Sequence, residues 1–147
     1  MVIQNLKKLY FIAKCILINK ENQILILKRS NYKNNGTGNL WDFPGGNVNL
    51  YEDVNIAINR EVKEETQITL NKIEVFSVDS CKKPDQEAQV IFTLFSSKDF
   101  DPNQEIKLSE EHTEYKWISK EEIDNYEYYL SKERKNKIKN YINLQIQ

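Results

Sequence analysis

Cysteine and histidine are scarce in this chain of 147 residues, which contains 2 cysteines and 1 histidine. Cys15 and Cys81 are too few for the disulfide framework that stabilises small secreted proteins. Because Cys15 lies in an apolar, strand-like run, we expect it to be a core residue. The single histidine, His112, excludes a histidine cluster of the kind that binds zinc, and as a lone loop residue it is expected to be exposed to solvent.

A strong excess of charge is also missing, because 21 lysine and arginine residues nearly balance 22 aspartate and glutamate residues, for a net charge of −1. This balance argues against global electrostatic attraction to nucleic acid or to a membrane surface. Long hydrophobic runs are absent as well. The apolar stretch 9–18 is interrupted by Lys14, is followed by no small-residue cleavage site and is too short to span a membrane. We therefore expect a cytoplasmic protein.

Internal repeats and low-complexity linkers are not found either. A length of 147 residues is sufficient for one hydrophobic core. The sequence thus predicts a single domain that spans residues 1–147.

Short apolar runs bounded by polar turns indicate several strands. The expected strands are residues 9–18, 23–28, 73–79, 89–96 and 115–118, with a further short extended piece at 41–43. The first two strands flank a turn and are expected to pair as a hairpin. Polar loops are expected at residues 30–40 and 99–109, and segment 80–88 is polar and typical of a flexible connection.

Helical periodicity is clearest at residues 53–66, where Val54, Ile58 and Val62 recur every four residues on one face. Ser119 begins a capping-box pattern that predicts a helix start, and residues 131–143 form a basic, helix-prone tail. This order of strands, helix, strands and terminal helix predicts an α+β protein with a mixed sheet covered on both faces.

The most informative segment is the acidic run Arg60-Glu61-Val62-Lys63-Glu64-Glu65. Its three glutamates stand at positions i, i+3 and i+4, which places them on one face of the expected helix. Like charges this close repel each other by about a few tenths of a kcal/mol per exposed pair. Carboxylate oxygens suit hard divalent cations, and a ligand set without sulfur or a histidine cluster favours Mg²⁺ or Mn²⁺ over zinc.

The acidic run is part of a longer pattern: Gly46, five residues, Glu52, seven residues, Arg60-Glu61-Val62, one residue, Glu64-Glu65, one residue, then Gln67 and Ile68. This pattern resembles the Nudix box of the Nudix hydrolases, in which a glycine stands at the position of Gln67. Gln67 either adopts the left-handed conformation of that glycine, at a cost of about 1 kcal/mol, or the helix ends differently. The similarity extends to residues 40–46 and 114–118 and so covers most of the chain.

The resemblance implies the Nudix fold, an α/β/α sandwich with a mixed β-sheet and a loop-helix-loop catalytic box. It implies metal ligands at the Gly46 carbonyl, Glu61, Glu64, Glu65 and Glu111. Arg60 and Glu52 are implied to brace the loop against the helix, and a plain surface ion pair is the alternative for Arg60. The general base is left open between a box glutamate and one outside the box, for which Glu111 is the first candidate and Glu110 the second.

Substrate-binding residues are implied at Arg29, Gly45 and Gly46, although Arg29 is equally well interpreted as a plain surface charge. Tyr32 and its loop are candidates for stacking on a base. We expect three large aromatic side chains to lie in the hydrophobic core: Trp41, Phe43 and Trp117.

Nudix enzymes hydrolyse a nucleoside diphosphate linked to another moiety, by attack of water at phosphorus. The short chain and the WDFPGG segment are similar to small MutT-type pyrophosphatases, which release pyrophosphate and a nucleoside monophosphate from a nucleoside triphosphate. Pro84, sixteen residues beyond Ile68, is spaced as in ADP-ribose pyrophosphatases, so ADP-ribose or another nucleotide sugar is the alternative substrate. We expect the binding partner to be a small nucleotide rather than nucleic acid, and we expect no association with a membrane. The expected assembly is a monomer or a homodimer.

Two further alternatives differ in class. A non-catalytic nucleotide sensor with the same fold would commonly have lost box carboxylates, and this chain retains Glu61, Glu64 and Glu65. An enzyme that processes RNA 5′ ends would need a basic path toward its site, which the near-neutral charge does not indicate.

Overall fold

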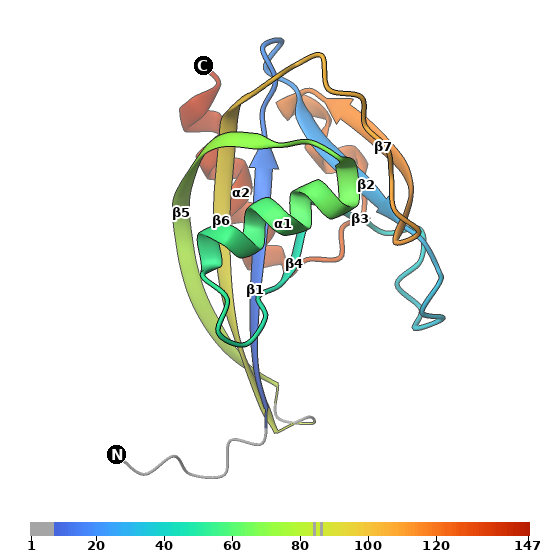
Figure 1. Ribbon diagram of the computed structural model, residues 1–147, viewed down its shortest axis with the longest axis vertical. Helices are drawn as coiled ribbons and strands as arrows, with labels where there is room; N and C mark the ends of the chain where they lie inside the picture. Colours follow the sequence, from blue (N-terminus) through green and yellow to red (C-terminus); the bar gives the residue numbers. More distant parts are fainter. Residues whose placement is uncertain (1–7, 84, 86) are drawn as a thin grey trace.

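The computed structural model describes residues 8–83, 85 and 87–147 (Figure 1). Pro84, on whose spacing the ADP-ribose alternative depends, lies outside these residues. Among the described residues, no helix combines the length and the apolar character needed to cross a membrane.

Two β-sheets form the centre of the fold (Figure 1). The first has the strand order β4-β1-β6-β5, with β1 at Lys8–Leu17, β4 at Gly45–Asn47, β5 at Leu70–Lys83 and β6 at Ala88–Phe100. The second has the order β3-β2-β7, with β2 at Ile24–Arg29, β3 at Trp41–Asp42 and β7 at His112–Ile118. Since β1 and β6 run parallel and the other pairs are antiparallel, the first sheet is mixed, as expected.

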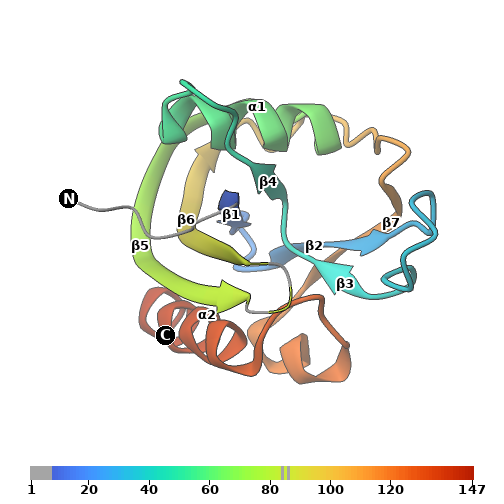
Figure 2. The same ribbon diagram turned by 90° about the horizontal axis from the view of Figure 1, so that it is seen from below.

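Two α-helices cover opposite faces of this sheet, as Figure 2 shows. They are α1 at Val54–Thr66 and α2 at Lys132–Gln145, and a 3-10 helix, η2 at Lys120–Asn125, precedes α2. The expected α+β class and the α/β/α layering of the Nudix fold are thereby confirmed.

Strand β1 separates the core into two clusters because successive side chains of a strand point to opposite faces. The cluster on the α1 side contains Ala13, Cys15, Leu17, Ile58 and Val62, and that on the α2 side contains Ile16, Ile18, Ile138 and Ile142. Cys15 is fully buried, as predicted. Trp41 and Phe43 are also core residues, whereas Trp117 is only partly buried because β7 is an edge strand.

The predicted hairpin between the first two strands is wrong. Strands β1 and β2 belong to different sheets, and their ends meet at a bridge between Ile18 and Ile24 and a hydrogen bond from the Asn19 N–H to the Gln23 carbonyl. A strand has two edges, and those of β1 are occupied by β4 and, along its whole length, by β6. Proximity in the sequence was therefore overridden by pairing with a distant segment.

The predicted flexible segment 80–88 is also largely wrong. Strand β5 continues to Lys83 and pairs there with Ala88, the first residue of β6. The side chains of residues 80–83 are polar and exposed, yet their backbones form ladder hydrogen bonds, which do not depend on side-chain polarity.

The ends of α1 show how the box helix is fixed. The Asp53 side chain accepts hydrogen bonds from the backbone N–H groups of Asn55 at 2.8 Å and Ile56 at 3.3 Å. At the other end Gln67 adopts the left-handed conformation, with φ 66°, so the glutamine takes the glycine conformation rather than ending the helix differently. Its backbone N–H and side-chain amide both donate to the Lys63 carbonyl, which offsets part of the strain.

The capping pattern at Ser119 begins a short 3-10 helix, since the Ser119 N–H donates to the Glu122 carboxylate at 2.8 Å. The helix predicted for the basic tail is confirmed as α2.

Candidate active site

Two glycines allow β4 to pass very close to its neighbours. Gly45 has φ 141°, and a Cβ at this position would lie 2.1 Å from the Ala13 carbonyl oxygen. A Cβ at Gly46 would lie 2.7 Å from the Glu61 carboxylate. Any larger residue at either position would displace β1 or the first box glutamate, so both glycines are required by the site.

Arg60 ties the loop before α1 to the helix. Its guanidinium donates to both Glu52 carboxylate oxygens, at 2.7 and 2.9 Å, and to the Asn47 carbonyl at 3.1 Å. The hydrogen bond from Arg60 is the main reason that the pKa of Glu52 is lowered to about 2. This geometry matches the bracing role implied for Glu52 and Arg60, and the role itself stays a prediction.

The three box glutamates differ in burial. The side chain of Glu64 is 58% exposed, that of Glu61 is nearly buried and that of Glu65 is buried. Arg60 contacts the Glu61 carboxylate at 2.9 Å and that of Glu64 at 3.2 Å, so one cation partly neutralises both. Burial raises the pKa of Glu61, against the opposing effect of Arg60.

Glu65 lies deepest and connects α1 to β4 and β7. One carboxylate oxygen accepts the Gly45 N–H at 2.9 Å, and the other lies 3.2 Å from Nδ1 of His112. Burial raises the pKa of Glu65 to about 8, although Lys14 and the Gly45 hydrogen bond act in the opposite direction. A carboxyl group in this state releases its proton readily when a cation binds beside it.

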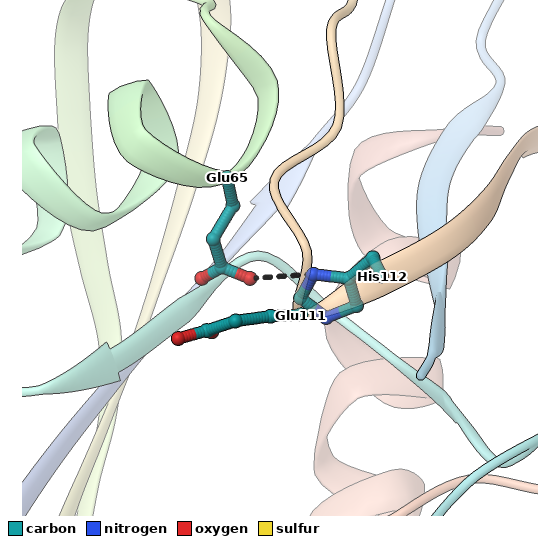
Figure 3. A group of neighbouring side chains, drawn as sticks. All are labelled: Glu65, Glu111 and His112. Atoms are coloured by element: carbon teal, nitrogen blue, oxygen red, sulfur yellow. Dashed lines mark ion pairs between the residues drawn. The ribbon is translucent and has the colours of Figure 1, made fainter. Parts of the chain in front are cut away.

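His112 is buried, so the prediction of a solvated histidine is wrong. It is the first residue of β7 and points toward Glu65, whereas Glu111 in the preceding turn is exposed (Figure 3). Burial lowers the pKa of His112 to about 4, which keeps the imidazole neutral. The burial of His112 could not be predicted from the sequence, because β7 is distant from α1 along the chain and meets it only in the folded protein.

Glu65, Glu111 and His112 each offer a ligand atom, and these atoms lie within 4.8 Å of one another. Nδ1 of His112 is buried and, among the described residues, has no hydrogen-bond partner of good geometry. A buried acceptor beside two carboxylates fits a divalent cation at this position. The residues present are therefore suited to the metal that the resemblance implies, with Glu61 and Glu64 on the adjoining helix turn.

A cavity of about 300 Å³ lies next to these carboxylates. The predicted site residues that line it are Arg29, Gly45, Gly46, Glu61 and Glu111, joined by Tyr32. Glu111 accepts a hydrogen bond from the Tyr32 hydroxyl at 3.1 Å, while Glu110 contributes its backbone carbonyl to the Ser30 hydroxyl. The placement favours Glu111 over Glu110 as the glutamate outside the box that could act as a base, and the assignment stays a prediction.

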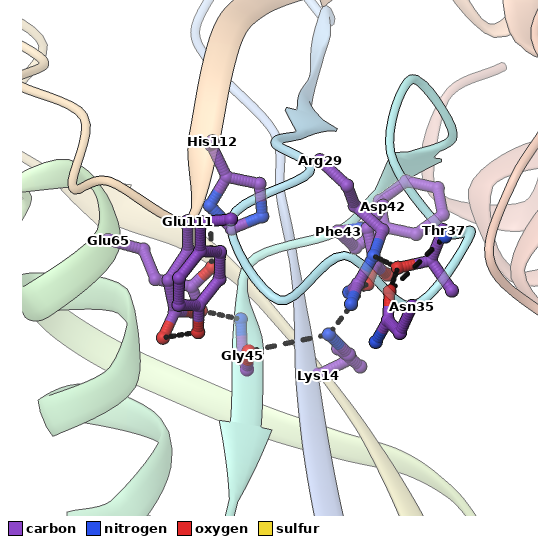
Figure 4. A network of polar contacts seen from close by, with 11 residues as sticks. Lys14, Arg29, Asn35, Thr37, Asp42, Phe43, Gly45, Glu65, Glu111 and His112 are labelled. Atoms are coloured by element: carbon purple, nitrogen blue, oxygen red, sulfur yellow. Dashed lines mark hydrogen bonds and ion pairs between the residues drawn. The ribbon is translucent and has the colours of Figure 1, made fainter.

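Arg29 is not a free surface charge. Its guanidinium donates to Asp42 at 3.1 Å and to Thr37 at 3.2 Å (Figure 4). It also lies 4.3 Å from the ring centre of Tyr129. Asp42 is fully buried and also accepts a hydrogen bond from Lys14. Sequence reasoning missed Lys14, Asp42 and His112 as site residues. The one available signal was a charged residue inside an apolar strand pattern, at Lys14.

Comparison with known proteins agrees with this architecture. The model of a family described as the NUDIX domain matches residues 11–141, a range that contains the box helix and every residue of the cavity. The fold and site thus define a hydrolase of nucleotide phosphoanhydrides. The chain belongs to the Nudix family.

Individual relatives are similar over most of their length. Nucleoside triphosphatase NudI of Escherichia coli O139:H28 is 29% identical over 122 residues, covering 77% of this chain and 84% of NudI. The crystal structure of a MutT protein from Methanosarcina mazei Go1 is 28% identical, with a TM-score of 0.78 over 96% of this chain and 98% of that one. An Ap4A hydrolase complex from C. elegans, at 21% identity and a TM-score of 0.68 over 92% and 97% of the two chains, shares the fold.

Proposed function

We propose that this protein hydrolyses a nucleoside triphosphate to a nucleoside monophosphate and pyrophosphate, with Mg²⁺ or Mn²⁺ as the cofactor. The observation that supports it best is a group of carboxylates at one cavity. Glu61 and Glu111 line the cavity, Glu65 lies within 4.8 Å of Glu111, and Glu64 is beside them on the helix. The names of the similar NudI and MutT proteins favour a nucleoside triphosphate over ADP-ribose. We also propose that residues 1–147 form one domain, active in the cytoplasm as a monomer or homodimer.

The chemical problem is the repulsion between the anionic phosphates and an attacking oxygen nucleophile. A divalent cation, when bound, neutralises the phosphates and lowers the pKa of water. The Gly46 carbonyl, Glu61, Glu64, Glu65 and Glu111 are the groups that would hold it, and Arg60 and Glu52 keep the loop and helix in register.

The reaction needs a base near the attacked phosphorus. A carboxylate, Glu111 or a box glutamate, accepts a proton from water as the new P–O bond forms, and the phosphoanhydride P–O bond breaks to release pyrophosphate. Glu111 is suited to this task because it is exposed to the cavity rather than buried like Glu65.

The test is a panel of nucleoside triphosphates and ADP-ribose, incubated with purified protein in Mg²⁺, in Mn²⁺ and in EDTA, with products separated by chromatography. We expect metal-dependent release of pyrophosphate, lost in Glu64→Gln and Glu65→Gln variants that remain folded. Formation of only AMP and ribose 5-phosphate from ADP-ribose would refute the substrate. Calorimetry that detects no uptake of either metal, even with nucleotide present, would refute the mechanism and favour a binding module.

A further inference from the structure

Lys14 is a buried lysine on a face of β1 that is otherwise apolar. Its neighbours on the same face, Ile12 and Ile16, pack into the α2-side cluster, and Lys14 is only 9% exposed. A buried ammonium group is strongly unfavourable unless it is paired. Charged residues that break a local core pattern in this way mark functional positions more often than structural ones.

The contacts of Lys14 hold it at the wall of the cavity. Its Nζ donates to Asp42 Oδ2 at 2.9 Å and to the Gly45 carbonyl at 3.3 Å (Figure 4). Burial acts to lower the pKa of Lys14, but Asp42 and Glu65 outweigh it and the pKa is raised, so the side chain is a cation. An ammonium has three hydrogens, and these two acceptors account for two of them.

Arg29 shares the same carboxylate oxygen. Its Nη1 lies 3.1 Å from Asp42 Oδ2, so two cations converge on one buried anion. Both cations also line the cavity. Among the described residues, Asp42 and Gly45 are the two acceptors of the Lys14 ammonium, which leaves one of its hydrogens for a ligand that enters the cavity.

The position of this pair within the cavity indicates what it binds. Glu61 and Gly46 lie on the α1 side, where the metal ligands are. Ile12, Phe92 and Tyr129 line the opposite side and also border a second hollow next to α2. An aromatic and aliphatic surface suits a nucleoside, so the phosphate nearest the nucleoside falls between the two sides, beside Lys14 and Arg29.

We propose that Lys14 is a substrate-binding residue that, together with Arg29, binds the phosphate adjacent to the nucleoside, and that Asp42 positions both cations for this contact. The inference rests on the proposed function for the identity of the ligand. It predicts recognition of a phosphate oxygen by Lys14 even when no metal is present, because the lysine and arginine are held by the protein alone.

The experiment compares the binding affinities of two ligands for three proteins, under conditions in which no hydrolysis occurs. Affinities for a nucleoside and for its 5′-monophosphate are measured in EDTA, by NMR titration, for the wild type, Lys14→Met and Lys72→Met. We expect the wild type to prefer the monophosphate and Lys14→Met to lose about 10- to 100-fold of that preference. Lys72→Met removes the same charge from an exposed position on β5 and should keep the preference.

Two outcomes would overturn the proposal. An unchanged preference in Lys14→Met would show that Lys14 only neutralises Asp42 and Glu65. An equal loss for nucleoside and monophosphate would place Lys14 against the base. Because no hydrolysis is measured, failure of the proposed triphosphatase activity would leave this result unaffected, and the two failures are distinguishable.

If the Lys14→Met variant does not fold, a second measurement on the wild-type protein tests the same proposal. The side-chain ammonium signal of Lys14 is followed by NMR in the wild-type protein, with Lys14→Arg used to assign it. We expect the signal to shift on addition of the monophosphate and not of the nucleoside. No shift with either ligand at saturation would refute the proposal.

Discussion

The two helices that cover the sheet differ in how their charges are arranged. On the α1 side, the carboxyl groups of Glu61, Glu65 and Glu111 lie close enough to affect one another electrostatically, and Glu65 is buried. On the α2 side, two aspartates, Asp79 and Asp124, are each paired with two cations. Asp79 contacts Arg134 at 2.7 Å and Lys137 at 3.2 Å.

Their apolar contacts differ in the same sense. Helix α2 buries Ile138 and Ile142, and Tyr141 stacks on Phe76 with ring centres 3.9 Å apart. Helix α1 also buries apolar residues, but its last turns carry Glu61 and Glu65, and the charge of Glu61 is one of the effects that raise the pKa of Glu65. We infer that α2 is organised for stability and the C-terminal half of α1 for the proposed metal-dependent chemistry, at a cost in stability.

The largest effect should follow from Glu65→Gln. Removal of one proposed metal ligand should reduce kcat/KM by about 10²- to 10³-fold, because several kcal/mol of charge stabilisation in the transition state is lost. Stability of the metal-free variant should be unchanged or higher, since a neutral amide replaces a buried acid. Steady-state kinetics and urea unfolding check both points. Glu21→Gln, in the turn after β1, is the control, and a parallel loss of activity there would contradict the interpretation.

On the α2 side, Ile142→Ala should give the opposite combination. The cavity left by a fully buried side chain should lower the free energy of unfolding by about 2–5 kcal/mol. Activity per folded molecule should stay the same, because α2 contributes none of the proposed metal ligands. Leu144→Ala on the same helix, where the side chain is 70% exposed, should change stability by less than about 0.5 kcal/mol. Loss of turnover in folded Ile142→Ala would remove the contrast between the helices.

The two regions should also respond to pH in opposite directions. The pKa of Glu65 is about 8 in the fold against 4.5 ordinarily, so the folded protein holds a proton that the unfolded chain releases. The contribution of Glu65 to stability in EDTA should therefore fall as pH rises from 4.5 to 8. Asp79, with a lowered pKa, stabilises the fold above pH 3.8, and this contribution is lost as the pH falls below that value.

Urea unfolding at a series of pH values measures both effects. The pKa of His112 is about 4 in the folded protein and ordinarily 6.5, so His112 makes stability rise with pH up to pH 6.5. The contribution of Glu65 is therefore measured between pH 6.5 and 8, where His112 no longer titrates. Glu65→Gln should abolish the decrease in stability between pH 6.5 and 8. Asp79→Asn should reduce only the loss of stability at acidic pH. An identical pH profile for wild type and Glu65→Gln would show that Glu65 titrates normally.

The smallest effect is expected at the C-terminus of α1. Gln67→Gly should raise the free energy of unfolding by about 0.5–1 kcal/mol, because glycine adopts φ 66° without strain and only one side-chain hydrogen bond is lost. Thermal unfolding measures this, with activity expected to stay constant. The same change at Gln145, in the last turn of α2, should instead lower stability. A loss of stability in Gln67→Gly would mean that the Lys63 contacts outweigh the backbone strain.

Much of the fold could be predicted from local patterns. The box helix was placed within one residue, because a four-residue apolar repeat and an N-cap aspartate are encoded by neighbours in the sequence. Most strands were predicted, with the exception of β4 at Gly45–Asn47, but strand pairing was not. The hairpin of β1 and β2 failed because the partners of β1 come from residues 45–47 and 88–97.

The site divides in the same way. Spacing along one helix was enough to nominate Glu61, Glu64 and Glu65 as metal ligands. It could not reveal that Glu65 would be buried against His112, or that Lys14 would meet Asp42, 28 residues away. Those contacts join segments from different sheets and from the helix, so they cannot be predicted from local sequence periodicity.

The sequence by itself determined that one helix would carry a row of glutamates on one face, because helical geometry depends only on the order of nearby residues. Tertiary structure alone decided which ionisable groups are buried: Glu65, His112, Asp42 and its partner Lys14. The physical reason is that burial, and with it the pKa and binding character of each group, depends on what the rest of the chain packs against it.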